Sequence, residues 1–133
     1  MIYMKKEQVD EILAHSRGEA PAEACGILAG REGRVERVYQ MVNMDRSSST
    51  FLMEPKEQLK VMKEIRGAGL ELTGIYHSHP ESEAYPSAHD VELAFYPEAS
   101  YVIISLKDAG SPGIKSYRIA EGVITGEEMV VES

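Results

Sequence analysis

Hydrophobic periodicity along the chain predicts three helices. Residues 5–16 repeat apolar side chains every three or four positions, and Gly18 is expected to end that helix. A second helix is expected to begin at Pro55, because proline is tolerated in the first helical turn. A third is expected to begin at Ser87 and to end near Pro97. The apolar stripes would be Val9, Ile12 and Leu13 in the first helix, Leu59, Met62 and Ile65 in the second, and Val91, Ala94 and Phe95 in the third.

Six strands are predicted around these helices. Apolar stretches at 24–29 and 35–42 flank the turn-like sequence Gly30-Arg31-Glu32-Gly33, which predicts a hairpin. Residues 101–106 form a continuous apolar run, which is typical of a strand buried on both faces. The element order α-β-β-α-β-α-β-β-β predicts a mixed α/β domain with helices packed on a sheet. The remaining strands are expected at 70–77, 113–119 and 123–131.

The composition is that of an ordinary globular domain. With 133 residues, of which 43% are hydrophobic, the chain is expected to form one domain over residues 1–133. Its net charge of −8 argues against nucleic acid as a partner, because phosphate binding needs a basic face. No apolar run has the length of a membrane span, and no signal peptide is visible. With a single cysteine, Cys25, these features predict a cytoplasmic protein without disulfides; they leave the oligomeric state open, a homodimer included.

The segments His77-Ser78-His79-Pro80 and Ser87-Ala88-His89-Asp90 carry the strongest chemical signal. In an extended strand, side chains alternate between faces, so His77 and His79 point the same way. Two imidazoles on one side can bind a single ion, and Asp90 can supply a third ligand. Three protein ligands leave a fourth position open for water, which is the arrangement of a catalytic zinc site. The two segments therefore predict a metallohydrolase.

Each segment also has a simpler interpretation. Ser87 can be the N-cap of the third helix, with Asp90 completing a capping box. The two histidines can be polar residues at the end of a strand. We favour the metal site, because random placement rarely yields two histidines on one face, a proline that turns the chain and a carboxylate at a helix start. Capping and metal binding are also compatible, since they use different atoms.

The spacing of these residues resembles the signature of a known enzyme family. His-Ser-His, seven residues, Ser, two residues and Asp is similar to the pattern of the JAMM metalloproteases, also called MPN-plus domains. The segment Pro21-Ala22-Glu23-Ala24-Cys25-Gly26 resembles the Glu-x-Cys-Gly setting of the upstream glutamate in that family. The resemblance extends along nearly the whole chain. It implies the MPN/JAMM fold: a curved, partly barrel-like mixed sheet flanked by helices, with a cytidine-deaminase-like architecture.

The resemblance also implies a role for each residue of the site. His77, His79 and Asp90 would bind one Zn²⁺ per chain. Glu23 would be the general acid and base, and Ser87 would steady the tetrahedral intermediate. The chemistry agrees, because a zinc-bound water needs a nearby carboxylate that takes its proton and later protonates the leaving amine.

Four neighbouring residues are less informative. Cys25 is expected to be a small buried thiol rather than a fourth ligand. His89 occupies a variable position of the family signature and is expected at the surface or behind the ligands. Tyr85 either lines the substrate groove or packs against the domain, and His15 receives no role.

The resemblance narrows the substrate to a few classes. Compact members of the family are similar to bacterial and archaeal hydrolases of ubiquitin-like sulfur-carrier proteins, which end in Gly-Gly. Such enzymes release an amino acid or short peptide from that terminus. A groove beside the zinc would accept an extended chain, most simply by pairing with an exposed strand edge, and would be narrow enough to select glycine. The segments Gly74–Pro80 and Ala84–Ser87 are most similar to this branch.

Other classes remain as alternatives. They are a general deubiquitinase-like isopeptidase, a hydrolase of cell-wall or other peptides, and a catalytically silent MPN scaffold. The chain is short for the insertions with which deubiquitinases grip ubiquitin, and silent scaffolds lose the metal ligands that this chain keeps. A zinc deaminase needs Pro-Cys-x-x-Cys, which a chain with one cysteine does not have.

Overall fold

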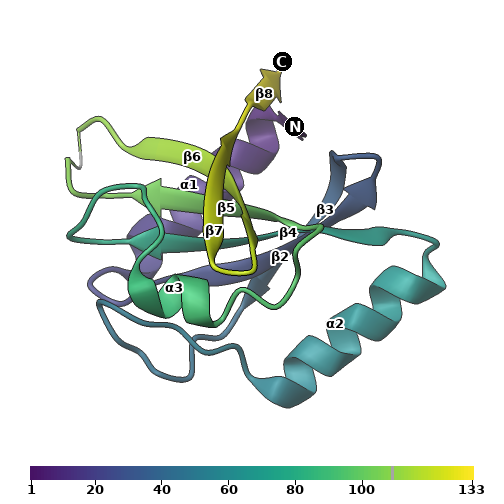
Figure 1. Ribbon diagram of the computed structural model, residues 1–133, viewed down its shortest axis with the longest axis horizontal. Coiled ribbons are helices and arrows are strands. Elements are labelled where there is room, and N and C mark those ends of the chain that lie inside the picture. Colours follow the sequence, from purple (N-terminus) through teal and green to yellow (C-terminus); the bar gives the residue numbers. More distant parts are fainter. Residues whose placement is uncertain (109) are drawn as a thin grey trace.

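The computed structural model describes residues 1–108 and 110–133 of the chain. One curved sheet dominates the ribbon, with helices on both of its sides (Figure 1). None of the helices in the described part has the length and apolar character that a bilayer span requires. The elements are, in order, β1 (Ile2–Lys5), α1 (Lys6–Glu19), β2 (Cys25–Arg31), β3 (Arg34–Met41), α2 (Pro55–Gly67), β4 (Glu71–His79), α3 (Ala88–Glu92), β5 (Ser100–Ser105), β6 (Gly113–Ala120), β7 (Val123–Glu127) and β8 (Met129–Glu132).

The eight strands form one sheet in the order β7-β6-β5-β4-β2-β3-β1-β8. The two outermost strands, β7 and β8, are neighbours in sequence and are separated by Glu128 alone. Because consecutive Cα atoms lie only about 3.8 Å apart, the two edges of the sheet must approach each other at this point. The Ile2 amide donates to the Glu128 carbonyl at 3.1 Å and joins β1 to the same corner. The sheet therefore curls almost into a barrel, which confirms the predicted curved, partly barrel-like sheet.

Alternating side chains of the sheet build an apolar core on each of its faces. On one face the sheet packs against α1, in a cluster that includes Ile12, Leu28 and Tyr76. On the other face it packs against α2, which contributes Val61 and Ile65. In Figure 1, α1 lies behind the strands and α2 lies below them. The predicted arrangement of helices on both sides of a mixed sheet is confirmed.

Strand β5 is buried along its whole length, as its continuous apolar run predicts. Strand β4 lies beside it, in parallel, and is buried from its third residue to its last. On β4, Ile75 belongs to the core under α2, and His77 and His79 follow it at the two-residue spacing of one face. The candidate site residues therefore begin where this core ends. The residues by which β5 contributes to the two cores are Val102 and Ile104 on the α1 face, and Tyr101 and Ile103 on the α2 face.

The helices differ from the prediction in three details. Helix α1 continues through Gly18, so the prediction that this glycine ends it is wrong. In α2, Leu59 was expected on the buried stripe but is 57% exposed, because it lies about 120° around the helix from the buried Ile65. Helix α3 ends at Glu92, well before the predicted end near Pro97. Phe95 therefore lies beyond the helix, and it is 70% exposed.

The strands differ from the prediction at both ends of the chain and at the end of β4. Strand β1 is not predicted, because four residues are too few for a recognisable period. The strand predicted over 123–131 is two strands, which break at Glu128 and lie at opposite edges of the sheet. Strand β4 runs through His79 instead of ending at His77, so both histidines lie within regular structure.

Glu127 joins three parts of the chain where the sheet closes. Its carboxylate accepts hydrogen bonds from the N-terminal amino group at 3.0 Å, from Arg118 Nε at 3.0 Å and from Ser116 Oγ at 2.6 Å. Burial by itself raises the pKa of this carboxyl, but the hydrogen bonds from these groups and from Ser100 lower the pKa to about 2.

We expect Glu127→Gln to lower the free energy of unfolding by about 2 kcal/mol at neutral pH, because it removes a charge held by several donors. A carboxylate with a lowered pKa stabilises the fold above its unfolded pKa of about 4.3, and this contribution is lost as the pH falls through that value toward the folded one. Urea denaturation of both proteins across the acid range measures the difference. The control is Glu128→Gln, a change at the exposed neighbouring residue, which should have little effect on the free energy of unfolding. If the stability lost in Glu127→Gln does not become smaller at acid pH, the role assigned to the Glu127 carboxylate is contradicted.

Candidate metal centre

The candidate site forms where the ends of β2 and β4 meet helix α3. Strands β2 and β4 are antiparallel, with Cys25 opposite His77. Residues directly opposed across a ladder share a face, so His77 and His79 point to the same side as Cys25. Both imidazole rings are buried in the domain, with 1% of His77 and 3% of His79 exposed. The strand therefore presents two ring nitrogens to one point.

The two histidines and Asp90 each direct one atom to a common centre. Nε2 of His77 and Nε2 of His79 are 3.0 Å apart, and each lies 3.1 Å from Oδ2 of Asp90. Among the described residues, these three are the group of buried side chains that could hold a metal ion. Imidazole nitrogens and a carboxylate oxygen at such separations are a typical donor set for one ion.

The hydrogen-bonding chemistry of this triangle calls for a positive charge at its centre. Nδ1 of His79 lies 2.8 Å from the Glu83 carbonyl, which can only accept, so Nδ1 carries the proton of the neutral ring. Nε2 is then a lone pair that faces another acceptor, the carboxylate oxygen of Asp90. A cation between the two atoms removes this conflict. The residues present therefore fit a metal ion.

The pKa directions of His77 and Asp90 agree with a ligand set, whereas that of His79 favours its protonated form. Burial lowers the pKa of His77 and keeps this ring neutral. Burial also disfavours charge on His79, but its hydrogen bonds to Asp90 and to the Glu83 carbonyl raise the pKa of that ring. For Asp90, hydrogen bonds with the two histidines and the Ser87 amide outweigh burial and hold the pKa of the carboxyl well below its usual range. An ionised carboxylate beside imidazoles is the form that binds a metal.

Only one of the two histidine rings has a hydrogen-bond partner for its second nitrogen. A metal-binding histidine usually donates its other N–H to an acceptor, which fixes the tautomer. His79 has this partner in the Glu83 carbonyl. Nδ1 of His77 is buried without a hydrogen-bond partner among the described residues, and so is Oδ1 of Asp90. The His77 ring is instead held by packing.

Glu23 lies beside the triangle without being part of it. It lies two residues before the start of β2, and the charges of His79 and Asp90 both act on its carboxyl, which places it near the triangle. Its side chain is 2% exposed, and Oε1 has no hydrogen-bond partner in the described part of the chain. Burial is the main cause that raises the pKa of Glu23 to about 8, with His79 lowering it and Asp90 raising it further. A buried carboxyl that holds its proton so near neutrality is well suited to proton transfer.

Helix α3 begins with the predicted capping box at Ser87, which is confirmed. Ser87 Oγ accepts from the Asp90 amide at 3.1 Å, and Oδ2 of Asp90 accepts from the Ser87 amide at 2.9 Å. The same oxygen, Oδ2, also faces the two histidines, so the expectation that capping and metal binding use different atoms is wrong for Asp90. The proton of the Ser87 hydroxyl is not used by the cap, so it remains free to donate to another group.

Two residues inside the motifs have structural roles that the sequence does not reveal. Ser78 points to the opposite face from the histidines, and its Oγ accepts from the Ala24 amide at 2.8 Å, while its own amide donates to the Ala24 carbonyl at 3.0 Å. At Gly26, a Cβ atom would lie 2.1 Å from the ring of Tyr76 and 2.5 Å from the Tyr39 carbonyl. Ser78 therefore binds the start of β2 to β4, and Gly26 allows the close approach of Tyr76.

Asn43, in the loop between β3 and α2, is a further residue that the sequence does not single out. It is buried and uses its whole hydrogen-bonding capacity. Nδ2 donates to the carbonyls of Glu23 at 3.0 Å and Thr50 at 3.2 Å, and Oδ1 accepts from the amides of Asp45 and Leu52, both at 3.0 Å. Asn43 therefore fixes this loop and the backbone of Glu23 to each other. One asparagine in a polar loop follows no period, so nothing in the pattern could have identified it.

Phe51, in the same loop, packs against the metal triangle. Its ring stacks on His77 with 4.7 Å between ring centroids and 27° between planes. The expected pairing of a substrate with a strand edge cannot involve β4, because β4 is bonded to β2 on one side and β5 on the other. Phe51 also lines an apolar pocket of about 130 Å³, together with Leu52, Met53, Ile75, Leu93 and Phe95.

Cys25 and His89 lie close to the site in sequence but are not part of the triangle. Cys25 is fully buried, with Sγ 4.0 Å from the Met41 carbonyl, and burial raises the pKa of the thiol to about 12. The prediction of a small buried thiol is confirmed. His89 is half-buried on α3, and its Nε2 has no hydrogen-bond partner among the described residues.

Tyr85 and His15 lie in other environments. Tyr85 packs edge-to-face on Tyr117, with ring centroids 5.5 Å apart, but 56% of it remains exposed. Nδ1 of His15 lies 2.7 Å from the hydroxyl of Tyr76, which belongs to the core under α1 on the other side of the sheet.

Fold and site together define a class of protein. A curved mixed sheet that carries a buried His-His-Asp triangle, with a buried glutamate next to it, is a metallopeptidase domain of the JAMM type. The comparison with known families agrees. The profile of the Prok-JAB family, described as prokaryotic homologs of the JAB domain, matches residues 5–120, and the chain belongs to this family.

Named relatives are similar over most of the chain. The CysO-cysteine peptidase of Mycobacterium tuberculosis is 41% identical over 133 residues, which cover 98% of this chain and 91% of that protein. The probable TtuB-protein conjugate cleaving protease of Thermus thermophilus is 37% identical, over 92% of this chain and 78% of that protein.

Solved structures confirm the fold. Protein DSY2949 from Desulfitobacterium hafniense superposes with a TM-score of 0.89 at 45% identity, over 99% of this chain and 93% of that one. AF2198, a JAB1/MPN domain protein from Archaeoglobus fulgidus, superposes with a TM-score of 0.66 at 20% identity, and each chain is covered completely.

We expect Asn43→Ala to lower the free energy of unfolding by about 2–4 kcal/mol, because buried carbonyl and amide groups would lose their partners. Asn43→Asp can still accept hydrogen bonds from the two amides, but it places a carboxylate oxygen next to the two carbonyls. It should therefore also lower the free energy of unfolding. Urea denaturation measures both variants, and Ser49→Ala, an exposed change in the same loop, should have little effect. Asn43→Asp with wild-type stability would contradict the role of the two donated hydrogen bonds.

Proposed function

We propose that this protein is a zinc-dependent peptidase that acts on conjugates of a ubiquitin-like sulfur-carrier protein. It hydrolyses the bond that follows the C-terminal Gly-Gly of the carrier and releases an amino acid or short peptide. The observation that carries this proposal is the buried triangle of His77, His79 and Asp90 with Glu23 beside it. Similarity over most of the chain to a CysO-cysteine peptidase and to a TtuB-protein conjugate cleaving protease supports the substrate class.

Zinc is the metal that we assign to the triangle. Two imidazole nitrogens and one carboxylate oxygen suit zinc in catalytic sites, where one further position is left for a reactant. When bound, Zn²⁺ supplies a Lewis acid that polarises the scissile carbonyl and makes a water more acidic. The Glu83 carbonyl and the cap at Ser87 hold two of the three ligands in orientation.

Glu23 moves the proton in this proposal. Its Oε1 has no competing hydrogen-bond partner among the described residues, and burial raises the pKa of its carboxyl to about 8. Such a group can take a proton from the attacking water and later give it to the leaving amine. The Ser87 hydroxyl, whose proton the cap leaves free, donates to the oxyanion that develops on the scissile carbonyl.

A Gly-Gly tail fits the surroundings of the site. The three ligand side chains are almost completely buried, and Phe51 covers His77, which leaves little space for side chains next to the reacting carbonyl. Glycine lets the backbone approach closely because it has no Cβ atom. The tail would enter over Phe51 rather than by pairing with β4, which has no free edge.

We assign the protein to the cytoplasm. The five residues to which we assign catalytic or metal-binding roles lie in what we regard as a single domain over residues 1–133. The one cysteine is buried and unpaired, as suits a reducing compartment.

We expect Glu23→Gln to reduce turnover by roughly 10²–10⁴-fold while zinc stays near one per chain, because only the proton-transfer group is lost. Asp90→Asn should reduce zinc retention as well as turnover, because a neutral amide oxygen binds the ion more weakly than a carboxylate. Steady-state kinetics and elemental analysis of the dialysed proteins separate the two effects. Loss of zinc from Glu23→Gln would make Glu23 a ligand and would contradict the role proposed for it.

Cleavage of a defined conjugate tests the substrate. A ubiquitin-like sulfur carrier ending in Gly-Gly and extended by one amino acid should be shortened by that residue, as read by mass spectrometry. Glu23→Gln is the negative control, and a carrier with an Ala-Ala tail should be cleaved far more slowly. Equal cleavage of both tails would remove the steric explanation. Hydrolysis of cell-wall peptides without cleavage of any carrier would transfer the protein to another substrate class.

A further inference from the structure

Helix α2 has two faces of contrasting character. Its buried face, with Val61 and Ile65, completes the core on one side of the sheet. Its opposite face is exposed and has no role in the site described above. The residues of this exposed face, which we call the basic face, are Lys56, Leu59, Lys60, Lys63 and Arg66.

The basic face contains no carboxylate. At 3.6 residues per turn, its five members span an arc of about 120°, and Glu57 and Glu64 fall outside that arc. No ion pair within 4.0 Å joins any of its four cations to a carboxylate in the part of the chain that the structure describes. A chain with a net charge of −8 thus presents four free cations on one helix face.

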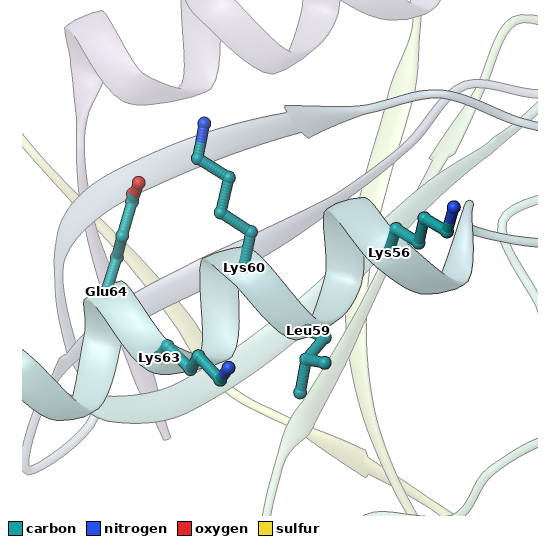
Figure 2. Close-up of a pocket in the computed structure, with 5 residues that line it drawn as sticks. All are labelled: Lys56, Leu59, Lys60, Lys63 and Glu64. Carbon is teal, nitrogen blue, oxygen red and sulfur yellow. The ribbon is translucent and has the colours of Figure 1, made fainter.

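An exposed leucine lies among these cations. Leu59 is 57% exposed and lines an open hollow of about 440 Å³ together with Lys56, Lys60, Lys63 and, at the edge, Glu64. Figure 2 shows Leu59 and Lys63 projecting to one side of the helix and Lys60 and Glu64 to the other, with Lys56 one turn before them. Protein interfaces commonly have an apolar centre and a polar rim, and an apolar residue surrounded by unpaired charges has this composition.

A different side of α2 lies beside the candidate site. Gln58, on the same helix, lines the apolar pocket that Phe51 shares. Phe51 stacks on His77, and the pocket includes the exposed Phe95. A partner that docks on the basic face would reach this pocket and the metal triangle with a flexible tail that passes around α2.

We propose that the basic face of α2 is the docking surface for the carrier domain of the conjugate, which presents an acidic patch with an apolar centre to it. The proposal rests on the proposed function and adds to it the surface that recognises the folded part of the substrate. Charge complementarity favours an acidic protein. Nucleic acid is a poorer match, because the remaining surface of this acidic chain would repel the phosphates beyond the short basic face.

Charge reversal on the basic face tests the proposal. The variant carries Lys56→Glu, Lys60→Glu and Lys63→Glu; the matched control carries Lys6→Glu, Arg17→Glu and Lys115→Glu, three exposed cations elsewhere with the same change in net charge. Each protein is given the carrier–amino-acid conjugate and, separately, a short peptide with the same Gly-Gly tail. We expect KM for the conjugate to rise by roughly tenfold or more in the variant alone, with kcat and peptide cleavage unchanged.

A binding measurement makes the result independent of turnover. Fluorescence anisotropy of the labelled carrier is measured with the Glu23→Gln protein, with and without the charge reversals. Weaker binding with the basic-face variant supports the docking surface, even if no conjugate is cleaved and the proposed function fails. Equal KM and equal carrier binding for the variant and its control would overturn the docking surface while leaving the peptidase intact. A loss confined to binding of a DNA duplex, or to self-association in sedimentation, would assign the face to another partner and would also overturn it.

Discussion

The site depends on the antiparallel pairing of β2 with β4, which brings the segment just before β2, with Glu23, to the two histidines although more than fifty residues separate them in sequence. The pairing is reinforced where the strands reach the site, since Ser78 bonds the Ala24 backbone with both its hydroxyl and its amide. The alternation of side chains then determines the rest: His77 and His79 point to one face and Ser78 to the other. The serine between the histidines therefore joins the segment that carries Glu23 to β4, while the histidines face the candidate metal centre.

Asp90, the third proposed ligand, is brought to the same point by hydrogen bonds within its own helix turn. The capping box at the start of α3 uses the Asp90 carboxylate to accept from the Ser87 amide, and the same oxygen lies 3.1 Å from both imidazoles. One short helical turn thus positions a ligand without a long element behind it. Asn43 has a comparable function on the other side, because it fixes the Glu23 backbone and the loop that carries Phe51. Local hydrogen bonds from loops complete a site that the sheet begins.

The sequence predicts the parts of this structure that repeat or that have a distinctive spacing. The helical periods, the buried run of β5 and the His-Ser-His to Asp spacing are of this kind, and the capping box at Ser87 follows from residue type alone. What it does not predict depends on contacts distant in sequence. The break at Glu128 is set by closure of the sheet, since the two strands that it separates bond to opposite edges. The roles of Asn43, Phe51 and Gly26 arise from partners far along the chain, and the exposure of Leu59 follows from which side of α2 meets the sheet.

The central claim is that His77, His79 and Asp90 hold one zinc ion and that Glu23 lies beside the ion without binding it. Anomalous diffraction at the zinc absorption edge, from crystals grown with zinc, tests this directly because it locates the ion independently of any assay. We expect one anomalous peak enclosed by Nε2 of His77, Nε2 of His79 and Oδ2 of Asp90, with the Glu23 carboxylate outside bonding distance. Zinc found elsewhere with no peak in the triangle, or a peak bonded to Glu23, would contradict the account.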